Sequence, residues 1–253
     1  MANKSVSLSF DVDWATDTEI ADTVEILEKG NARATFFATH RTEVLANLDR
    51  SRFEIALHPN FIPLLEGNPR EQGVTFREIL VEAQGMYPEA VGLRSHGLVH
   101  SGPLQAFAAE HGFLYESNSF VPAFVAPFRD WDRIIRIPTY WSDYRELLVG
   151  TPFRADGLEL HGSITSILAF HPVHVFVNSV TPAHFNAARS KRGDVPALLA
   201  CRHTGAEKGI RDFLVDMLRR VRDEDIELVT MREVAERHVT LHGESVSVQP
   251  SVG

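Results

Sequence analysis

The chain has 253 residues, of which 44% are hydrophobic and 23% are charged, and its formal net charge at pH 7 is −9. This composition is typical of a globular protein with one large core, and the negative charge argues against nucleic acid or an anionic membrane as the main partner. No secretory signal and no run near the roughly 18 apolar residues of a membrane span are visible, so we expect no stable membrane insertion. The single cysteine, Cys201, excludes an internal disulfide and favours a reducing compartment, so we expect a cytoplasmic protein.

Strand and helix signals alternate along the chain. Residues 5–10 alternate serines with Val6, Leu8 and Phe10, which predicts a half-buried strand, and the capping box "TDTE" then starts a helix that ends near Gly30. Further strands are predicted at 34–39, 53–57, 90–95, 113–117, 133–141 and 163–170, and further helices at 75–87 and 103–112. A helix over 209–223, a strand over 226–230 and a helix over 231–238 close the series.

This alternation predicts a parallel sheet. With about seven strand–helix units, we expect an α/β fold, a single-domain distorted (β/α)7 TIM-like barrel over residues 1–238, followed by a polar tail over 239–253. In such barrels the chemistry gathers at the carboxyl ends of the strands.

Polar residues follow the predicted strands. Asp11 and Asp13 are two positions apart in an extended chain, so both carboxylates point the same way, and two such charges disfavour each other unless a cation or a proton lies between them. The other strand ends offer His58, Arg94, His96, His100, Trp141, Asp143, His171 and His174. A set of imidazoles and carboxylates suits Zn²⁺ or a similar first-row ion. The competing interpretations are an N-cap and a loop acid for the aspartates, a turn residue for His58 and a local hydrogen bond for His171.

In their order and setting these segments resemble the polysaccharide deacetylase superfamily, also called the NodB-homology or carbohydrate esterase family 4 domain. "SFDVD" resembles its first motif, "EIALH" the strand before its metal histidine, and "GLRSHG" its arginine motif. "HGFLYESNS", "IPTYWSDY" and "LAFH" are similar to its later motifs. The similarity covers roughly residues 5–238, and the nearest branch is the WbmS-like deacetylases associated with O-antigen (lipopolysaccharide) biosynthesis.

The resemblance implies a role for each matching residue. Asp11 would be the general base, Arg94 would hold Asp11, and His171 would protonate the leaving group. Asp13 and His58 would bind a divalent metal ion, Zn²⁺ in the first place, with Co²⁺, Ni²⁺ or Mn²⁺ as alternatives. Trp141 and Asp143 would support His171 or bind the sugar. The implied substrate is an acetylated amino sugar or a glycan precursor.

The sequence departs from the family pattern at one metal ligand. The family's second motif is HxxxH, but the residue four positions after His58 is Ile62, which cannot bind a metal. The arginine motif has His96 where the family has proline, and Arg94 and His96 can face the same site because they are two positions apart. Our hypothesis is that His96 replaces the missing ligand, with Asn60 and His100 as weaker candidates.

Three functions remain open at this stage. The first is a metal-dependent hydrolase that removes an N- or O-acetyl group from a sugar. The second is a catalytically impaired relative that only binds carbohydrate. The third is another barrel metallohydrolase acting on a phosphoester or a cyclic amide, although the predicted first strand lacks the HxH pair common in two-metal sites of that kind. The sequence does not indicate an oligomeric state.

Overall fold

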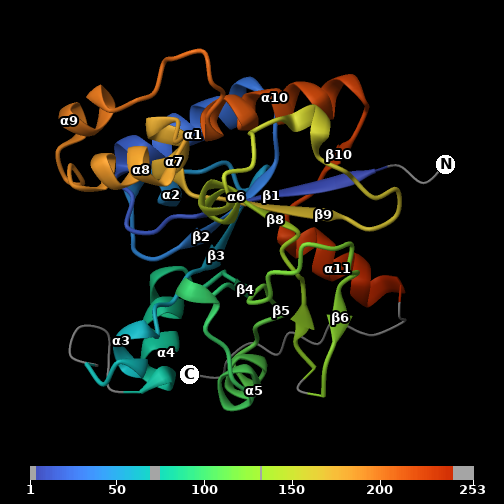
Figure 1. Cartoon of the computed structure of the whole chain (residues 1–253). Coiled ribbons are helices and arrows are strands. Elements are labelled where there is room, and N and C mark those ends of the chain that lie inside the picture. Colours follow the sequence, from blue (N-terminus) through green and yellow to red (C-terminus); the bar gives the residue numbers. More distant parts are fainter. Residues whose placement is uncertain (1–3, 69–74, 132, 242–253) are drawn as a thin grey trace.

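One curled sheet organises the molecule (Figure 1). The computed structural model describes residues 4–68, 75–131 and 133–241. Within these residues the strand order is β6-β7-β5-β4-β3-β2-β1-β9-β8, with β10 pairing to β1, and β6 alone runs antiparallel to its neighbour. The strands are β1 (Ser5–Asp11), β2 (Ala34–Ala38), β3 (Phe53–Leu57), β4 (Gly92–Leu93), β5 (Tyr115–Glu116), β6 (Phe128–Arg129), β7 (Ile135–Arg136), β8 (Trp141–Ser142), β9 (Ser166–Phe170) and β10 (Glu227–Leu228). The predicted distorted barrel is confirmed as a curled half-barrel.

Helices cover the outside of this sheet. Figure 1 shows α1, α7 and α10 together above the sheet and α4 and α5 together below it, in agreement with their contacts. The helices are α1 (Asp17–Lys29), α2 (Glu43–Ala46), α3 (Ile62–Leu65), α4 (Phe76–Met86), α5 (Gly102–Glu110), α6 (Asp143–Val149), α7 (Pro172–Val177), α8 (Pro182–Arg189), α9 (Val195–Ala200), α10 (Ile210–Asp223) and α11 (Met231–Leu241), with short 3-10 turns η2 (His96–Leu98) and η3 (Ala155–Gly157). The described residues contain no helix both long and apolar enough to cross a membrane.

The parallel pairing brings distant parts of the sequence to one edge. β1 lies between β2 and β9, with Phe10 paired to Phe36 and Phe170. The ladder continues past the strand ends, because the backbone N–H of His58 donates to Ala38 and that of Arg94 donates to Leu57. The residues that follow β1, β3, β4 and β9 therefore meet at the carboxyl edge of the sheet, as such topology requires.

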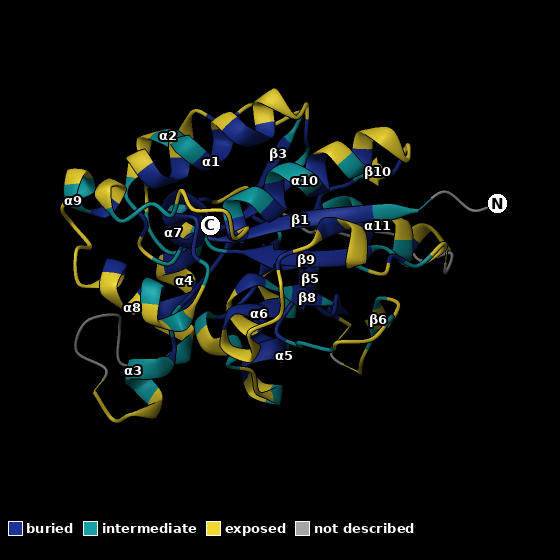
Figure 2. Ribbon diagram, turned by 45° about the horizontal axis from the view of Figure 1, so that its top comes forward, coloured by how far each residue is buried: buried dark blue, intermediate teal, exposed yellow. Residues whose placement is uncertain are grey.

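Both faces of β1 are buried, which corrects the prediction of a half-buried strand. Val6, Leu8 and Phe10 pack beneath the outer helices, while Ser7 and Ser9 are fully buried on the concave side. Figure 2 shows β1 as buried over most of its length. The concave side has its own cluster, in which residues of β2, β3, β5, β7 and β9 pack with α11. Helix α11 thus fills the concave side of the half-barrel, so Ser7 and Ser9 face packed protein rather than solvent.

Gly92 of β4 allows this interior to close tightly. A Cβ atom at that position would lie 1.9 Å from the Tyr115 ring. The Tyr115 hydroxyl donates to Glu54 at 2.8 Å inside the half-barrel, where burial, opposed by this and other hydrogen bonds, raises the pKa of Glu54. Only glycine fits this approach without displacing the aromatic ring.

Several predicted boundaries differ from the observed ones. The predicted strand over 133–141 is two short strands, β7 and β8, on different sides of the sheet order. No helix is predicted between the strand over 163–170 and the helix over 209–223, but α7, α8 and α9 lie there. The last helix continues to Leu241 and buries Val239, so the structured part extends past the predicted boundary at 238. The rest of the predicted tail, 242–253, lies outside the described residues.

Candidate metal and catalytic site

Asp11 and Arg94 form a buried ion pair at the end of β1. Arg94 Nη1 donates to Asp11 Oδ1 at 2.7 Å and to Ser9 Oγ at 3.0 Å. Its other donors reach Ser117 and Thr139, and its guanidinium lies 4.2 Å from the centre of the Phe37 ring. Burial raises the pKa of Asp11, but the charge of Arg94, with smaller effects of the neighbouring His58 and His171, outweighs burial and lowers it. Asp11 is therefore held as a carboxylate in a fixed orientation.

The turn after β1 has an unusual backbone. Asp13 and Trp14 both have positive φ angles, 46° and 57°. A bulky side chain rarely adopts this left-handed conformation, which costs on the order of 1–3 kcal/mol per residue and concentrates at functional sites. The Trp14 N–H donates to Thr39 Oγ1, which helps to hold the turn. As a result the Asp13 carboxylate turns toward two histidines from other strand ends.

Asp13, His58 and His96 converge on one point. Asp13 Oδ1 lies 3.2 Å from His58 Nε2 and 2.9 Å from His96 Nδ1, and the three donor atoms lie within 4.8 Å of one another. The close approach of the His58 and His96 rings outweighs the effect of burial and lowers the pKa of Asp13. The His96 backbone N–H is anchored on Pro59 and its ring contacts Trp14 edge-on.

The hydrogen bond of His58 decides what this cluster can bind. His58 Nδ1 donates to the Arg94 carbonyl at 2.6 Å, so the neutral ring presents a lone pair at Nε2. That lone pair faces a carboxylate oxygen of Asp13, and two acceptors at this distance need a proton or a cation between them. A histidine whose second nitrogen is bound to a carbonyl is the usual arrangement of a metal ligand. The cluster therefore fits a divalent metal ion.

The two weaker candidates for the missing ligand lie elsewhere. Asn60 Oδ1 accepts a hydrogen bond from the backbone N–H of Ile62, the first residue of α3. His100 is exposed, and its Nδ1 is bonded to the Leu98 carbonyl. Of the three candidates, His96 is the one whose ring nitrogen faces Asp13.

His171 approaches the other carboxylate oxygen of Asp13, Oδ2, and is held by Asp143. Its backbone N–H and its Nδ1 donate to the two carboxylate oxygens of Asp143, each at 2.7 Å. Its Nε2 lies 3.7 Å from Asp13 Oδ2. Burial lowers the pKa of His171, but the fully buried Asp143 carboxylate outweighs burial and raises the pKa to about 10. His171 is therefore protonated at neutral pH and can act as an acid.

His174 forms a second group with Asp143 and His171, but its chemistry differs. Burial lowers the pKa of His174 to about 4, so its ring is neutral at pH 7. Its Nδ1 is bonded to Ser179 Oγ at 3.0 Å. Because both Asp143 oxygens already accept hydrogen bonds from His171, this group offers a metal fewer open donor atoms than the Asp13 group does.

A cavity of about 580 Å³ opens onto these residues. Its lining includes Asp11, Asp13, His58, Arg94, His96 and His171, so six of the eight predicted site residues meet in it. Asp143 is fully buried behind His171 and does not line the cavity, so of its two predicted roles this position agrees with supporting His171 and not with binding the sugar.

Trp141 was predicted to bind the sugar or to support His171, and the first of these is wrong. Its ring is buried between Phe170 and Phe213, with centroid distances of 5.0 and 4.5 Å. It lies in the outer core and is not part of the cavity lining. Through Phe170 it supports the end of β9, immediately before His171.

Sequence reasoning missed the aromatic residues that do line the cavity. Trp14 and Tyr144 are both exposed and both line it, as does Phe120. The Tyr144 ring lies 6.2 Å from the rings of His171 and His174. One signal was available, because Trp14 directly follows the acidic pair and a large aromatic side chain is seldom placed on a loop without burial.

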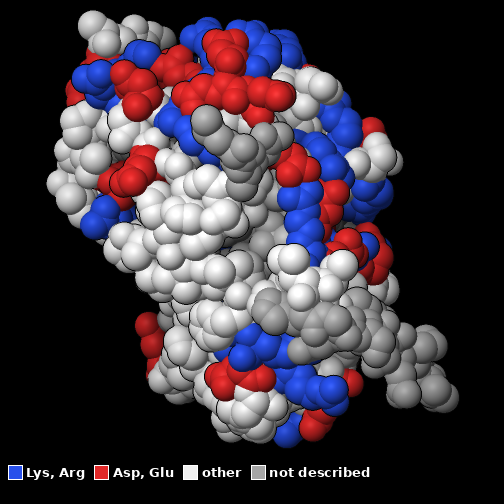
Figure 3. Space-filling model, turned by 90° about the vertical axis from the view of Figure 1, so that its right-hand side faces the viewer, with Lys and Arg blue, Asp and Glu red and all other residues white. Residues whose placement is uncertain are grey.

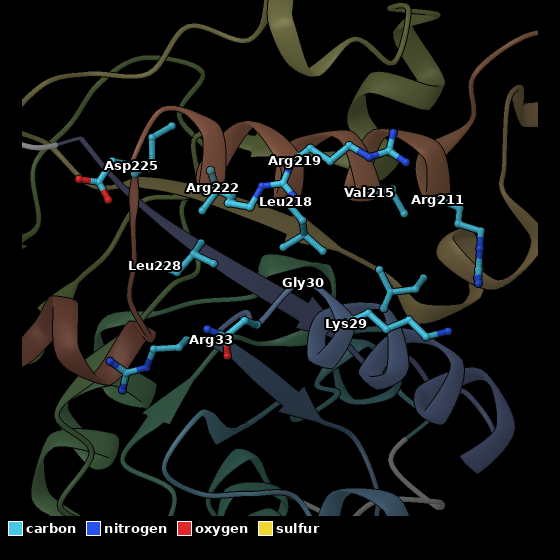
Figure 4. Close-up of a pocket in the computed structure, with 14 residues that line it drawn as sticks. Lys29, Gly30, Arg33, Arg211, Val215, Leu218, Arg219, Arg222, Asp225 and Leu228 are labelled. Carbon is cyan, nitrogen blue, oxygen red and sulfur yellow. The ribbon is translucent and has the colours of Figure 1, made fainter.

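A second cavity, of about 830 Å³, lies at the other end of the strands (Figure 4). Residues of α1 and α10 and of the segments before β2 and β10 line it, so it adjoins the amino ends of the parallel strands. Its positively charged residues are paired with neighbouring acids, as in Arg33–Glu233, Arg211–Asp22 and Arg219–Asp216. Figure 3 shows the same mixture of both signs on the face that it displays. None of the predicted site residues lines this cavity.

Comparison with known proteins gives the family. A profile of WbmS-like polysaccharide deacetylases matches residues 8–189. A solved structure from Bordetella bronchiseptica, described as a polysaccharide deacetylase involved in O-antigen biosynthesis, is 32% identical, with a TM-score of 0.79 over 87% of this chain and 91% of that chain. No match was found among curated proteins.

Two more distant structures share the fold. A polysaccharide deacetylase from Mycobacterium smegmatis is 18% identical, with a TM-score of 0.58 over 96% of this chain and 93% of that one. The peptidoglycan deacetylase PdaC from Bacillus subtilis is 13% identical, with a TM-score of 0.53 over 95% and 96%. With a profile match over most of its length and a relative above 30% identity, the chain belongs to the WbmS-like polysaccharide deacetylase family.

Proposed function

We propose that this protein is a metal-dependent deacetylase that removes the acetyl group from an acetylated amino sugar during cytoplasmic O-antigen (lipopolysaccharide) synthesis. The family and the O-antigen role described for the Bordetella bronchiseptica relative support the substrate class. The single cysteine, Cys201, which is free, supports a reducing compartment.

One observation carries the proposal. The His58 Nε2 lone pair and the His96 ring both face Asp13 Oδ1, at 3.2 and 2.9 Å, while His171 Nε2 lies 3.7 Å from the other oxygen, Oδ2, and Asp11 lines the same cavity. Asp13, His58 and His96 would hold the metal ion, with Zn²⁺ favoured by two imidazoles and one carboxylate. When bound, a divalent metal polarises the acetyl carbonyl and makes water more acidic.

Asp11 and His171 carry out the two proton transfers. Asp11, a carboxylate fixed by Arg94, accepts a proton from the attacking water. His171, protonated and fixed by Asp143, donates a proton to the leaving amine of an N-acetyl sugar or to the leaving alkoxide of an O-acetyl sugar. The aromatic rings of Trp14 and Tyr144 on the cavity wall offer apolar surface to the sugar ring.

Metal analysis combined with an acetate-release assay tests this proposal. The purified protein should contain about one equivalent of divalent metal and release acetate from members of a panel of N- and O-acetylated sugars, and a chelator should abolish the release. Asp11→Asn should keep the metal and lower kcat by about 100-fold or more. Fully metal-loaded protein that turns over no member of the panel would contradict the proposal, as would turnover that survives complete metal removal.

A further inference from the structure

The catalytic cavity continues beyond His171 toward α8. Its lining there consists of Pro182, Phe185, Asn186, Arg189 and Arg192, from α8 and the loop that follows it. The Phe185 ring lies 4.2 Å from the His174 ring, so this outer part of the cavity is continuous with the side of the site that holds the proton donor.

Arg189 and Arg192 are exposed cations within this outer part. Among the described residues, the structure gives neither guanidinium a hydrogen bond or an ion pair, whereas Arg202 and Arg211 both pair with Asp22. Acidic residues outnumber Lys and Arg by 34 to 25 in this chain, so acidic partners for an arginine are plentiful. Two unpaired guanidiniums in one cavity therefore offer a binding site for an external anion.

Arg192 also lies on the side of the cavity that holds His171 and His174. Its positive charge contributes to the lowered pKa of His174, so it lies near the Asp143–His171–His174 group. His171 serves the leaving group in the proposed mechanism, which means that this side of the cavity receives the sugar rather than the acetyl group.

From this arrangement we propose that Arg189 and Arg192 bind a phosphate or diphosphate group attached to the sugar, so that the substrate is a phosphate-linked acetylated sugar. This inference rests on the proposed deacetylase function, which places the sugar next to His171. A guanidinium can bind phosphate oxygens through two parallel hydrogen bonds, and two guanidiniums match the several oxygens and the two charges of a diphosphate. Their exposed position suits a group that extends out of the cavity.

A comparison of charged and neutral substrates tests the inference. The probes are UDP-N-acetylglucosamine, N-acetylglucosamine 1-phosphate and free N-acetylglucosamine, with acetate release and calorimetric binding measured for each. Binding is measured on the Asp11→Asn protein, which should consume the substrate at least about 100-fold more slowly. We expect the phosphate-linked probes to bind at least about tenfold more tightly than the free sugar, and the difference to shrink at high salt.

Single substitutions provide the matched control. Arg192→Ala and Arg189→Ala should each reduce the preference for the phosphate-linked probe by about tenfold. Lys191→Ala removes the same charge from the same loop, but Lys191 does not line the cavity, so the preference should change less than about twofold. A preference that survives both arginine substitutions, or equal binding of charged and neutral probes, overturns the inference.

The two proposals fail in different ways. Acetate release from free and phosphate-linked sugars with equal efficiency leaves the deacetylase function standing and removes the phosphate site. Arginine-dependent binding of the phosphate-linked probes without any acetate release leaves the phosphate site standing and removes the deacetylase function. A polyprenyl-diphosphate-linked N-acetyl sugar in detergent, assayed beside the UDP-sugar, distinguishes a lipid-linked from a nucleotide-linked source of the phosphate.

Discussion

At the level of single residues, the hydrogen bonding of His58 explains why the Asp13 cluster needs a cation. Its Nδ1 proton is committed to the Arg94 carbonyl, and its Nε2 lone pair points at a carboxylate oxygen of Asp13. The same carbonyl belongs to the arginine that orients Asp11. The candidate metal ligand His58 and the proposed general base Asp11 are thus both positioned by Arg94, through its backbone carbonyl and its side chain respectively.

His96→Ala should remove one ligand from the metal group. We expect the purified variant to retain less than about a tenth of the metal bound by the unmodified protein, because two ligands hold a first-row ion far more weakly than three. Mass spectrometry of the dialysed protein measures the metal content. His100→Ala is the control, since that exposed histidine lies outside the cluster, and unchanged metal content in His96→Ala would show that another residue is the third ligand.

Asp143→Asn should change the pH dependence of the reaction. The Asp143 carboxylate raises the pKa of His171 to about 10, so the acid keeps its proton through the alkaline range. Without the carboxylate charge, His171 loses its proton at lower pH, and the alkaline limb of the kcat profile should move to lower pH. At pH 9 we expect a loss of about 100-fold in kcat, with a smaller loss at pH 6. An alkaline limb that does not move would assign the proton donation to another group.

Most residues of the candidate site could be predicted from the sequence, because a polar residue directly after a buried strand has few structural reasons to be there. Asp11, Asp13, His58, Arg94, His96 and His171 were found in this way, and all line one cavity. Trp141 was misassigned because an aromatic side chain suits a sugar site and a core equally well. Its contact with Phe213, 72 residues further along the chain, decides for the core and follows from the tertiary packing alone.

At the level of secondary-structure elements, β8 and the helix α6 that follows it each carry an aromatic residue, one packed in the core and the other on the cavity wall. Trp141, in β8, is buried against Phe170 and Phe213, whereas Tyr144, in α6, is exposed in the cavity. Trp141→Ala should lower the free energy of unfolding by about 3–5 kcal/mol, measured by chemical denaturation.

Tyr144→Ala is the matched comparison for that substitution. We expect the free energy of unfolding to change by less than about 0.5 kcal/mol, because the side chain is exposed, and KM for the sugar to rise. If Tyr144→Ala destabilised the protein as much as Trp141→Ala, the division between the two roles would be wrong.

Most of the strands and the long amphipathic helices followed from periodicity, but β6 and the shorter helices α2, α3, α6, α7, α8 and α9 did not. The run "HPVHVFV" has no helical period, and α7 is buried all round against α1 and α10, so nothing polar marks its outer face. Pro172 and Pro182, each at the first turn of its helix, were the signals present. Because α8 carries Phe185, Asn186 and Arg189, missing it also concealed the outer part of the cavity.

The buried, neutral His174 affects the stability of the whole molecule. Its pKa is about 4 in the folded protein and about 6.5 in a solvent-exposed histidine, so between these values the unfolded chain binds more protons than the folded one. Stability conferred by the neutral ring is present above pH 6.5 and is lost as the pH falls toward 4. The contribution is about 3 kcal/mol.

The free energy of unfolding, measured by denaturant titration at steps from pH 7.5 to pH 4.5, should therefore decline more steeply for the unmodified protein than for His174→Asn. Asparagine can keep the hydrogen bond to Ser179 but does not take up a proton. Parallel curves for the two proteins in this range would show that His174 is not the source of the acid sensitivity.

The last strand and helix of the chain complete the first part of the sheet. β10 pairs with Ser5 and Val6 of β1, and α11 fills the concave face formed by β2, β3, β5, β7 and β9. Until β10 and α11 have been synthesised, the nascent polypeptide has an uncovered hydrophobic hollow and an unpaired end on its first strand. Native assembly of the half-barrel therefore waits for these two elements, and until they arrive the exposed apolar surface favours aggregation.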